Sequence, residues 1–400
     1  MNLRWKAIAF AGFSFLSFTV VGMGIVLPAW AAFHLGGSQL IGILFFAGSA
    51  AGIVAAPIAG HVVDSFSRTS VSAFGQLLRI LGLLLLAIAT KTTGLVATTF
   101  LIASSIVSVF GFILLSGALG GVLQALVPPK ERVAFVFRLS IAKQSGIAIG
   151  TGACGLLIQA YGAAWSALGA ILLILLSTPL VLAVCVDILR QRTTETLLKS
   201  SLEALHYLAR NHQALSASCG VGLAFALVQI ANLLLPGFVY HTLDGDSDLY
   251  GLMEMVATGG GIAAIAVSST RKIAEKLKRN FVALLISAGL LFMALSVTTS
   301  SMSAIIIYGL AGMVWSVLRS GADGHLLEVV DVKIIGRVQA FTTLLTAVIG
   351  MLTFLMPILF DQTKEATLFA ISGTMVVLTA SGLGLWNVRA AKSNENIAKS

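Results

Sequence analysis

Long apolar runs, each of about twenty residues, recur along the whole sequence, with short polar or glycine-rich breaks between them. A run of this length, folded as an α-helix, matches the thickness of a lipid bilayer. Hydrophobic residues make up 58% of the 400 residues and charged residues only 10%. Charged residues form about 25% of a typical soluble domain. The sequence therefore predicts an all-α integral membrane protein.

Twelve runs are long enough to be membrane-spanning helices. We predict them at 7–33, 39–60, 70–90, 94–127, 139–161, 164–187, 214–243, 249–269, 281–299, 303–327, 338–360 and 366–388. The first run follows Arg4 and Lys6 and continues for about 26 residues, whereas a cleavable signal peptide has an apolar core of about 7–15. We therefore expect it to remain as the first span.

Basic residues fall almost entirely in alternate breaks between these runs. About twenty lysines and arginines lie on the side of the N-terminus and about two, Lys91 and Lys364, on the other side. Because positively charged loops stay in the cytoplasm, both termini are predicted to be cytoplasmic. The same distribution accounts for the net charge of +9 without a nucleic-acid partner.

A polar stretch divides the twelve runs into two groups of six. We predict an N-terminal six-helix bundle over 1–187, a cytoplasmic linker over 188–213, and a C-terminal six-helix bundle with a basic tail over 214–400. Leucines at helical spacing predict an amphipathic helix on the membrane surface within the linker. Its role is interpreted as a tie between the halves, with regulation as the alternative.

A polar turn over 60–68 follows the second run. Gly60 is expected to let two helices approach closely, Asp64 to lie at a helix end, and Arg68 to begin the next helix. The pattern G-x-x-x-D-x-x-x-R at this place resembles the loop between helices 2 and 3 of the major facilitator superfamily of secondary transporters.

Two further turns are alike and lie about 205 residues apart, as a duplicated six-helix unit would leave them. One contains Arg132 before Val133, and the other contains Gly336 and Arg337 before Val338. With the six-plus-six arrangement and the basic linker, these turns make the whole chain resemble a major facilitator transporter. The resemblance implies that Gly60, Asp64, Arg68, Arg132, Gly336 and Arg337 are gating residues.

Three short segments, at 123–128, 205–210 and 335–338, resemble the branch that contains macrolide exporters and enterobactin-type siderophore exporters. The fifth run is similar to the glycine-rich fifth-helix motif of antiporters, although Gly150-Thr151 stands where that motif has a Gly-Pro pair. Its glycines would remove side chains from one face and let another helix pack closely. Ordinary small-residue packing is the alternative reading of Gly146, Gly150, Gly152 and Gly155.

Ionisable side chains within spans are rare because each is costly to bury away from water. Arg79 lies about nine residues into its span, or about 14 Å deep, and either faces a cavity or hydrogen-bonds between helices. Arg319 and Asp323 share a helix face at i and i+4. They form either a structural ion pair or a pair that opens when substrate or a proton arrives.

Glu254 is the other acid at depth, and it is either a proton-carrying carboxylate or a water-exposed residue at a channel mouth. Lys143 either extends to the cytoplasm or takes part in transport. Gln229 and Asn232 lie near mid-membrane before Pro236, which should loosen the helix. They form either a substrate wall or packing contacts.

Four histidines near span ends are interpreted as interfacial residues: His34, His61, His241 and His325.

The excess of basic over acidic residues at depth favours an anionic or carboxylate-rich substrate. We therefore predict a secondary exporter of a small secreted metabolite such as a siderophore, working by alternating access and proton antiport in a bacterial cytoplasmic (inner) membrane. A multidrug or macrolide-type efflux pump and an importer of a small organic anion are the alternatives.

Enzyme activity is not expected, because the carboxylates are scattered and no paired-aspartate or histidine-rich motif is present. The sequence contains no phosphate-binding P-loop for nucleotide, and its three cysteines lie too far apart in sequence to suggest a metal cluster. We expect no cofactor and no metal. The partners predicted are the substrate, protons and the lipid bilayer, with the protein working as a monomer, as the family usually does.

Overall fold

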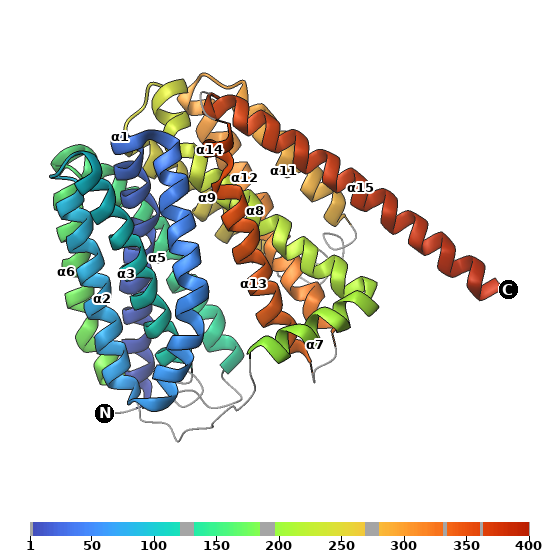
Figure 1. Cartoon of the computed structure of the whole chain (residues 1–400), viewed down its shortest axis with the longest axis horizontal. Helices are drawn as coiled ribbons and strands as arrows, with labels where there is room; N and C mark the ends of the chain where they lie inside the picture. The colour runs from blue at the N-terminus through green and yellow to red at the C-terminus, as the bar shows by residue number, and fades with distance from the viewer. Residues whose placement is uncertain are drawn as a thin grey trace.

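The computed structural model describes residues 3–120, 132–184, 197–268, 280–330, 334–360 and 363–399. Every element in these segments is an α-helix, as the sequence predicts (Figure 1). Ten of the described helices are long and apolar enough to cross a membrane. The protein is therefore a multi-pass membrane protein.

The first helix, α1 (Leu3–Ser65), contains the first two predicted spans. Its 63 residues are interrupted at Gly36 (φ −163°, ψ 27°) and Gly37 (φ 64°, ψ −165°). The φ of Gly37 lies in the left-handed region, which glycine occupies without a steric penalty. The kink thus falls in the break that separates the predicted spans at 7–33 and 39–60.

Four helices pack with α1 to form the N-terminal helix group. They are α2 (Arg68–Ala89), α3 (Gly94–Gly120), α5 (Arg132–Tyr161) and α6 (Ala163–Val184). The start of α2 at Arg68 agrees with the prediction. Its N-cap is Ser67, whose side chain accepts a hydrogen bond from the backbone N–H of Ser70.

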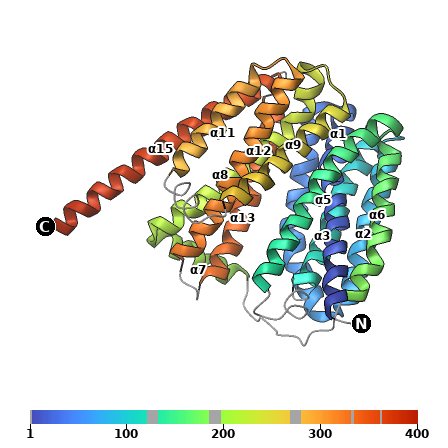
Figure 2. The same ribbon diagram turned by 180° about the vertical axis from the view of Figure 1, so that it is seen from behind.

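Within the described segments, six long helices and the four-residue α14 form the C-terminal helix group (Figure 2). They are α8 (His212–Thr242), α9 (Ser247–Ser268), α11 (Phe281–Ser296), α12 (Ser301–Val329), α13 (Ile335–Phe354), α14 (Met356–Leu359) and α15 (Glu365–Lys399). α11 has only 16 residues and ends before the predicted position 299. α15 continues to Lys399, beyond the predicted end at 388.

A short helix, α7 (Leu197–Arg210), lies between the two groups in sequence and packs against α8 and α13. Leu208 is buried there in an apolar cluster with Ala217, Leu326 and Val338. The helix forms where the leucine spacing predicts one. Most of the remaining linker lies outside the described residues, so the division of the chain at 188–213 stays a prediction.

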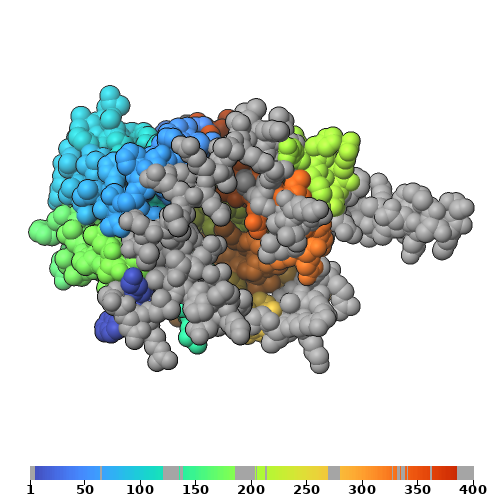
Figure 3. All heavy atoms as spheres, turned by 90° about the horizontal axis from the view of Figure 1, so that it is seen from below, coloured from blue at the N-terminus to red at the C-terminus, as the bar shows by residue number. Residues whose placement is uncertain are grey.

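We call the face that carries the N-terminus and α7 the proximal face, and the face that carries the turns at 90–93, 243–246 and 297–300 the distal face. The two helix groups converge towards the distal face and diverge towards the proximal one (Figures 1 and 2). Seen from the proximal face, α1–α6 and α12–α13 lie on opposite sides of the molecule (Figure 3).

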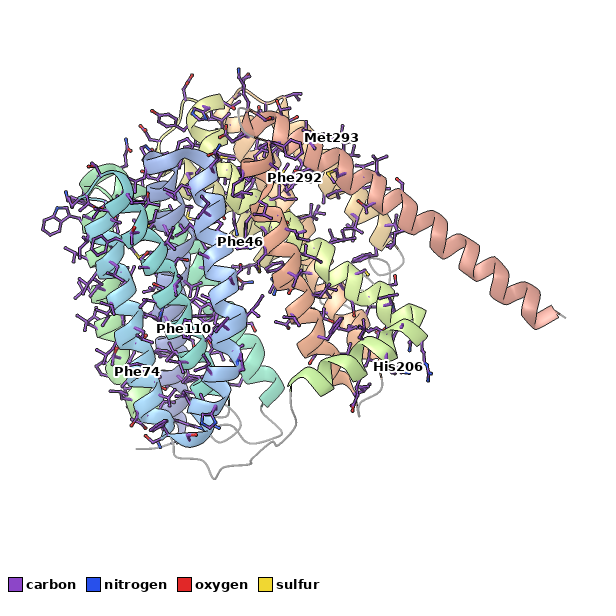
Figure 4. The ribbon with its side chains drawn as sticks, in the orientation of Figure 1. Phe46, Phe74, Phe110, His206, Phe292 and Met293 are labelled. Carbon is purple, nitrogen blue, oxygen red and sulfur yellow. The ribbon has the colours of Figure 1, made fainter. Side chains whose placement is uncertain are left out.

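Large apolar side chains such as that of Phe74, 52% exposed, cover the outside of the helices (Figure 4), as contact with lipid requires.

Candidate functional site

The most deeply buried carboxylate in the described spans belongs to Glu254, on α9. Only 5% of the residue is exposed, so the alternative of a water-exposed residue at a mouth is wrong. The hydroxyl of Tyr308, on α12, donates a hydrogen bond of 2.7 Å to Glu254 Oε1. A charged group in such surroundings is costly unless it is paired or can take up a proton.

Tyr250 lies one helical turn before Glu254 and is fully buried. Within the described residues its hydroxyl has no hydrogen-bond partner. The ring of Trp30, on α1, is stacked on the Tyr250 ring with their centroids 6.0 Å apart. Glu254 therefore lies one helical turn from the Trp30–Tyr250 ring contact, which joins the two helix groups. Sequence reasoning missed both tyrosines, although the i, i+4 spacing of Tyr250 and Glu254 could have identified the first of them.

The two helix groups touch most closely where α5 crosses α9. A Cβ added to Gly155 would lie 2.9 Å from the Cα of Gly251, and one added to Gly152 would lie 2.6 Å from the sulfur of Met255. The hydroxyl of Ser247 also donates a hydrogen bond of 3.0 Å to the carbonyl of Gly155. Because any side chain at Gly155 would push the helices apart, closure of the distal half depends on this glycine.

The glycines of α5 pack against two different helices. The sequence predicts one glycine face that contacts a single helix. Gly146 and Gly150 face α1, where a Cβ added to Gly146 would lie 2.5 Å from the carbonyl oxygen of Phe15. A Cβ added to Gly150 would overlap the carbonyl of Thr19. The first pair therefore packs α5 within its own group, whereas Gly152 and Gly155 pack it against the other group.

Replacing Gly150 with leucine is expected to lower the free energy of unfolding by about 1–3 kcal/mol, because the new side chain must displace the α1 backbone. Thermal unfolding of the purified protein in detergent would measure the change. Gly169→Leu is the matched control, since nothing lies within 4 Å of an added Cβ at that position on α6. Equal melting temperatures for the two variants would contradict the packing described here.

Arg79, on α2, is 5% exposed and hydrogen-bonds between helices. Its guanidinium donates to the hydroxyl of Ser17 at 3.0 Å, to the carbonyl of Ser17 at 3.2 Å and to Gln76 Oε1 at 2.9 Å. The amide of Gln76 in turn donates to Ser177, on α6, at 3.3 Å. Within the described residues none of the hydrogen-bond partners of Arg79 is a carboxylate, so the geometry matches the interhelical alternative and leaves the positive charge unneutralised.

Lys143 is half-buried on α5, one helical turn before Ile147. Its ammonium group lies 5.0 Å from the centroid of the Phe18 ring on α1. A cation over an aromatic face is stabilised by the ring quadrupole. Lys143 and Arg79 thus contact consecutive residues, Phe18 and Ser17, of the same helix.

The predicted ion pair between Arg319 and Asp323 is not formed. Both residues are exposed, and the described residues contain no salt bridge between them. The Arg319 guanidinium instead lies 5.9 Å from the centroid of the Phe225 ring on α8. Sharing a helix face was not sufficient for pairing, because an aromatic neighbour on another helix is an alternative partner for the guanidinium.

Gln229 and Asn232 are half-buried on α8. Gln229 Nε2 lies 3.8 Å from the position of a Cβ added to Gly350, on α13, so it faces that helix. The helix continues without interruption through Pro236 to Thr242, so the expected loosening is not a break in α8.

At the proximal face, Arg68 Nη1 donates a hydrogen bond of 2.9 Å to the carbonyl of Ala118, near the end of α3. Gly60 is exposed and nothing lies within 4 Å of an added Cβ, so the close helix approach expected there is wrong. The other residues expected to gate, Asp64, Arg132, Gly336 and Arg337, have backbones within helices. The side chains of Asp64, Arg132 and Arg337 lie outside the described part of the structure.

A family model described as the Major Facilitator Superfamily matches residues 9–354. No curated protein sequence matches the chain. Among solved structures, the nucleoside transporter NupG is similar with a TM-score of 0.76 at 17% identity, covering 96% of this chain and 99% of its own. A bacterial homologue of the iron transporter ferroportin in an inward-facing state has a TM-score of 0.78 at 13% identity, covering 96% and 98%. The peptide-family transporter PepTSo has a TM-score of 0.71 at 10% identity, covering 98% and 99%.

Proposed function

The chain belongs to the Major Facilitator Superfamily, and we propose that it exports a small, carboxylate-rich secreted metabolite, such as a siderophore, by alternating access coupled to proton antiport. It is a secondary active transporter, not an enzyme, and moves a small molecule across a lipid bilayer. The solved structures named above are a nucleoside transporter, a homologue of an iron transporter and a transporter of the POT family. At identities of 17% or less they contribute the fold and no substrate.

The proposal places the protein, as a monomer, in a bacterial cytoplasmic membrane with its proximal face in the cytoplasm. The charge difference between the loops supports this orientation. The converging distal half then corresponds to a state closed towards the outside and open inwards. Asp64, Arg68, Arg132, Gly336 and Arg337 are proposed to latch the proximal face when it closes. The hydrogen bond from Arg68 to α3, within the N-terminal helix group, holds that arginine at this face.

Two arginines that form no salt bridge within the described residues, Arg79 and Arg319, support an anionic substrate. Arg79 is buried with hydrogen-bond partners that are not carboxylates, and Arg319 lies over the Phe225 ring without forming a salt bridge to Asp323. A transported carboxylate that displaces Ser17 and Gln76 from Arg79, or that binds Arg319, would form hydrogen bonds between two charged groups, which these arginines do not make in the resting protein. Gln229, Asn232 and Lys143 are proposed to line the same path.

Proton coupling is assigned to Glu254. Its carboxylate is enclosed by Tyr308 and Tyr250 under the distal contact between the groups. When the distal half opens, water would reach this site. A carboxylate whose hydration changes between two states can hold a proton in one and release it in the other.

The test is metabolite profiling of cells with and without the protein, grown at low and high iron, with medium compared against cytoplasm. We expect deletion to trap an iron-chelating acid inside low-iron cells. The same cells are also tested for susceptibility to added drugs. If deletion raises drug susceptibility and leaves the metabolites in the medium unchanged, multidrug efflux replaces the proposal. Accumulation of an organic anion in the medium of deleted cells would instead identify an importer.

Replacing Arg79 with alanine is expected to trap the same acid inside the cell and to reduce its export at least about fivefold, since a buried charged hydrogen-bond donor is lost. Arg79→Lys keeps the charge and should retain part of the export. Arg138→Ala is the matched control, because that arginine is exposed at the proximal end of α5. Membrane levels of each variant are measured by immunoblot, and equal export by Arg79→Ala and Arg138→Ala at equal levels would contradict a role for the buried cation.

A further inference from the structure

A carboxylate at the distal face joins three helices that are far apart in sequence. The hydroxyl of Ser38 donates a hydrogen bond of 2.7 Å to Glu365 Oε1. His241 Nδ1 lies 3.1 Å from Glu365 Oε2. Ser38 directly follows the kink in α1, His241 is close to the end of α8, and Glu365 is the first residue of α15.

The position of Glu365 is fixed from several sides. Only 7% of the residue is exposed, and its carboxyl lies against Gly237, on α8, where an added Cβ would overlap it. A negative charge in the first turn of a helix is also favoured by the helix dipole. This acid is therefore held in one place, unlike a solvated surface carboxylate.

The Ser38 hydrogen bond crosses from one helix group to the other, whereas the His241 contact stays within the C-terminal group. Further contacts between the groups lie next to it. The rings of Phe33 and His241 have centroids 5.3 Å apart, as do those of Phe45 and Phe354. Any separation of the groups at the distal face must break the Ser38 hydrogen bond and can leave the His241 contact intact.

We propose that Glu365 is a distal latch, which holds the two helix groups together through Ser38 and releases Ser38 when the distal face opens. A hydrogen bond to an ionised acceptor is stronger than one between neutral groups. His241 acts as a positioning residue. It belongs to the same helix group as Glu365, so it keeps one oxygen of the carboxylate bound in the open state. The proposal rests on the alternating access of the proposed function and adds Ser38 and Glu365, which the sequence patterns did not identify.

The test measures the distance between spin labels on the two groups at the distal face. Lys91→Cys and Thr299→Cys supply the label sites in a background without native cysteines, and both residues are exposed in distal turns. The unmodified chain is expected to show a short and a long distance whose ratio changes with pH or substrate. Glu365→Ala and Ser38→Ala should each shift the ratio towards the long distance by about tenfold or more.

The double variant Ser38→Ala with Glu365→Ala should shift the ratio no further than the larger single variant, because both remove the same hydrogen bond. Asp244→Asn, an exposed acid of the same face, should leave the ratio unchanged. If the unmodified chain shows both distances and neither single variant changes their ratio, the latch is overturned and alternating access is not. A single distance in the wild type under every condition would overturn alternating access, and the latch with it.

Discussion

Export driven by a proton gradient is expected to be lost when Glu254 is replaced with glutamine, with the fold retained. The amide has the shape of the acid and can still accept the hydrogen bond from Tyr308. It binds no proton, so the coupling between proton and substrate disappears. Such couplings are worth about 5- to 150-fold in affinity, and proton-driven flux into everted membrane vesicles should fall by at least about tenfold.

Asp248→Asn is the matched control for this variant, because it removes an exposed acid from the first turn of the same helix, α9. Tyr308→Phe keeps the carboxylate and removes only its hydrogen bond, so it should retain proton-driven flux at a reduced rate. If Glu254→Gln vesicles respond to an imposed pH gradient as the unmodified vesicles do, Glu254 is not the coupling group.

Leucine at Gly155 is expected to block transport altogether, because the distal halves of the two groups could no longer meet. The Cβ alone would lie 2.9 Å from the Cα of Gly251 and 3.1 Å from its backbone nitrogen, and backbone atoms cannot move aside as a flexible side chain can. In the label experiment above, the short distal distance should disappear.

The comparison for Gly155→Leu is Gly382→Leu, on α15, where nothing lies within 4 Å of an added Cβ. That variant should transport and switch like the unmodified chain. Retention of the short distance by Gly155→Leu would show that the crossing of α5 and α9 does not limit closure.

Hydrophobic patterning was sufficient to predict the architecture. The period of apolar runs gave the positions of the spans because, in lipid, each span must satisfy its own backbone hydrogen bonds within a helix. The break between the first two runs even coincides with the kink at Gly36 and Gly37. The start of α2 at Arg68 followed from the same polar turn.

The partners of the polar side chains could not be predicted in this way. Arg79 hydrogen-bonds to Ser17, 62 residues away, and Glu365 to Ser38, 327 residues away. Local spacing carries no information about which helices become neighbours at such separations. Where local spacing did suggest a pair, at Arg319 and Asp323, a distant aromatic ring lay within reach of the arginine instead.

Flux measured in everted membrane vesicles would test the central proposal most directly. The probe is the iron-chelating acid isolated from the medium of low-iron cells, and the vesicle lumen, which corresponds to the cell exterior, is made acidic. We predict concentrative uptake of this acid that stops when the pH gradient is collapsed and that is absent from vesicles lacking the protein. Equal uptake by vesicles with and without the protein, or uptake that survives collapse of the gradient, would contradict proton-driven export of a carboxylate-rich metabolite.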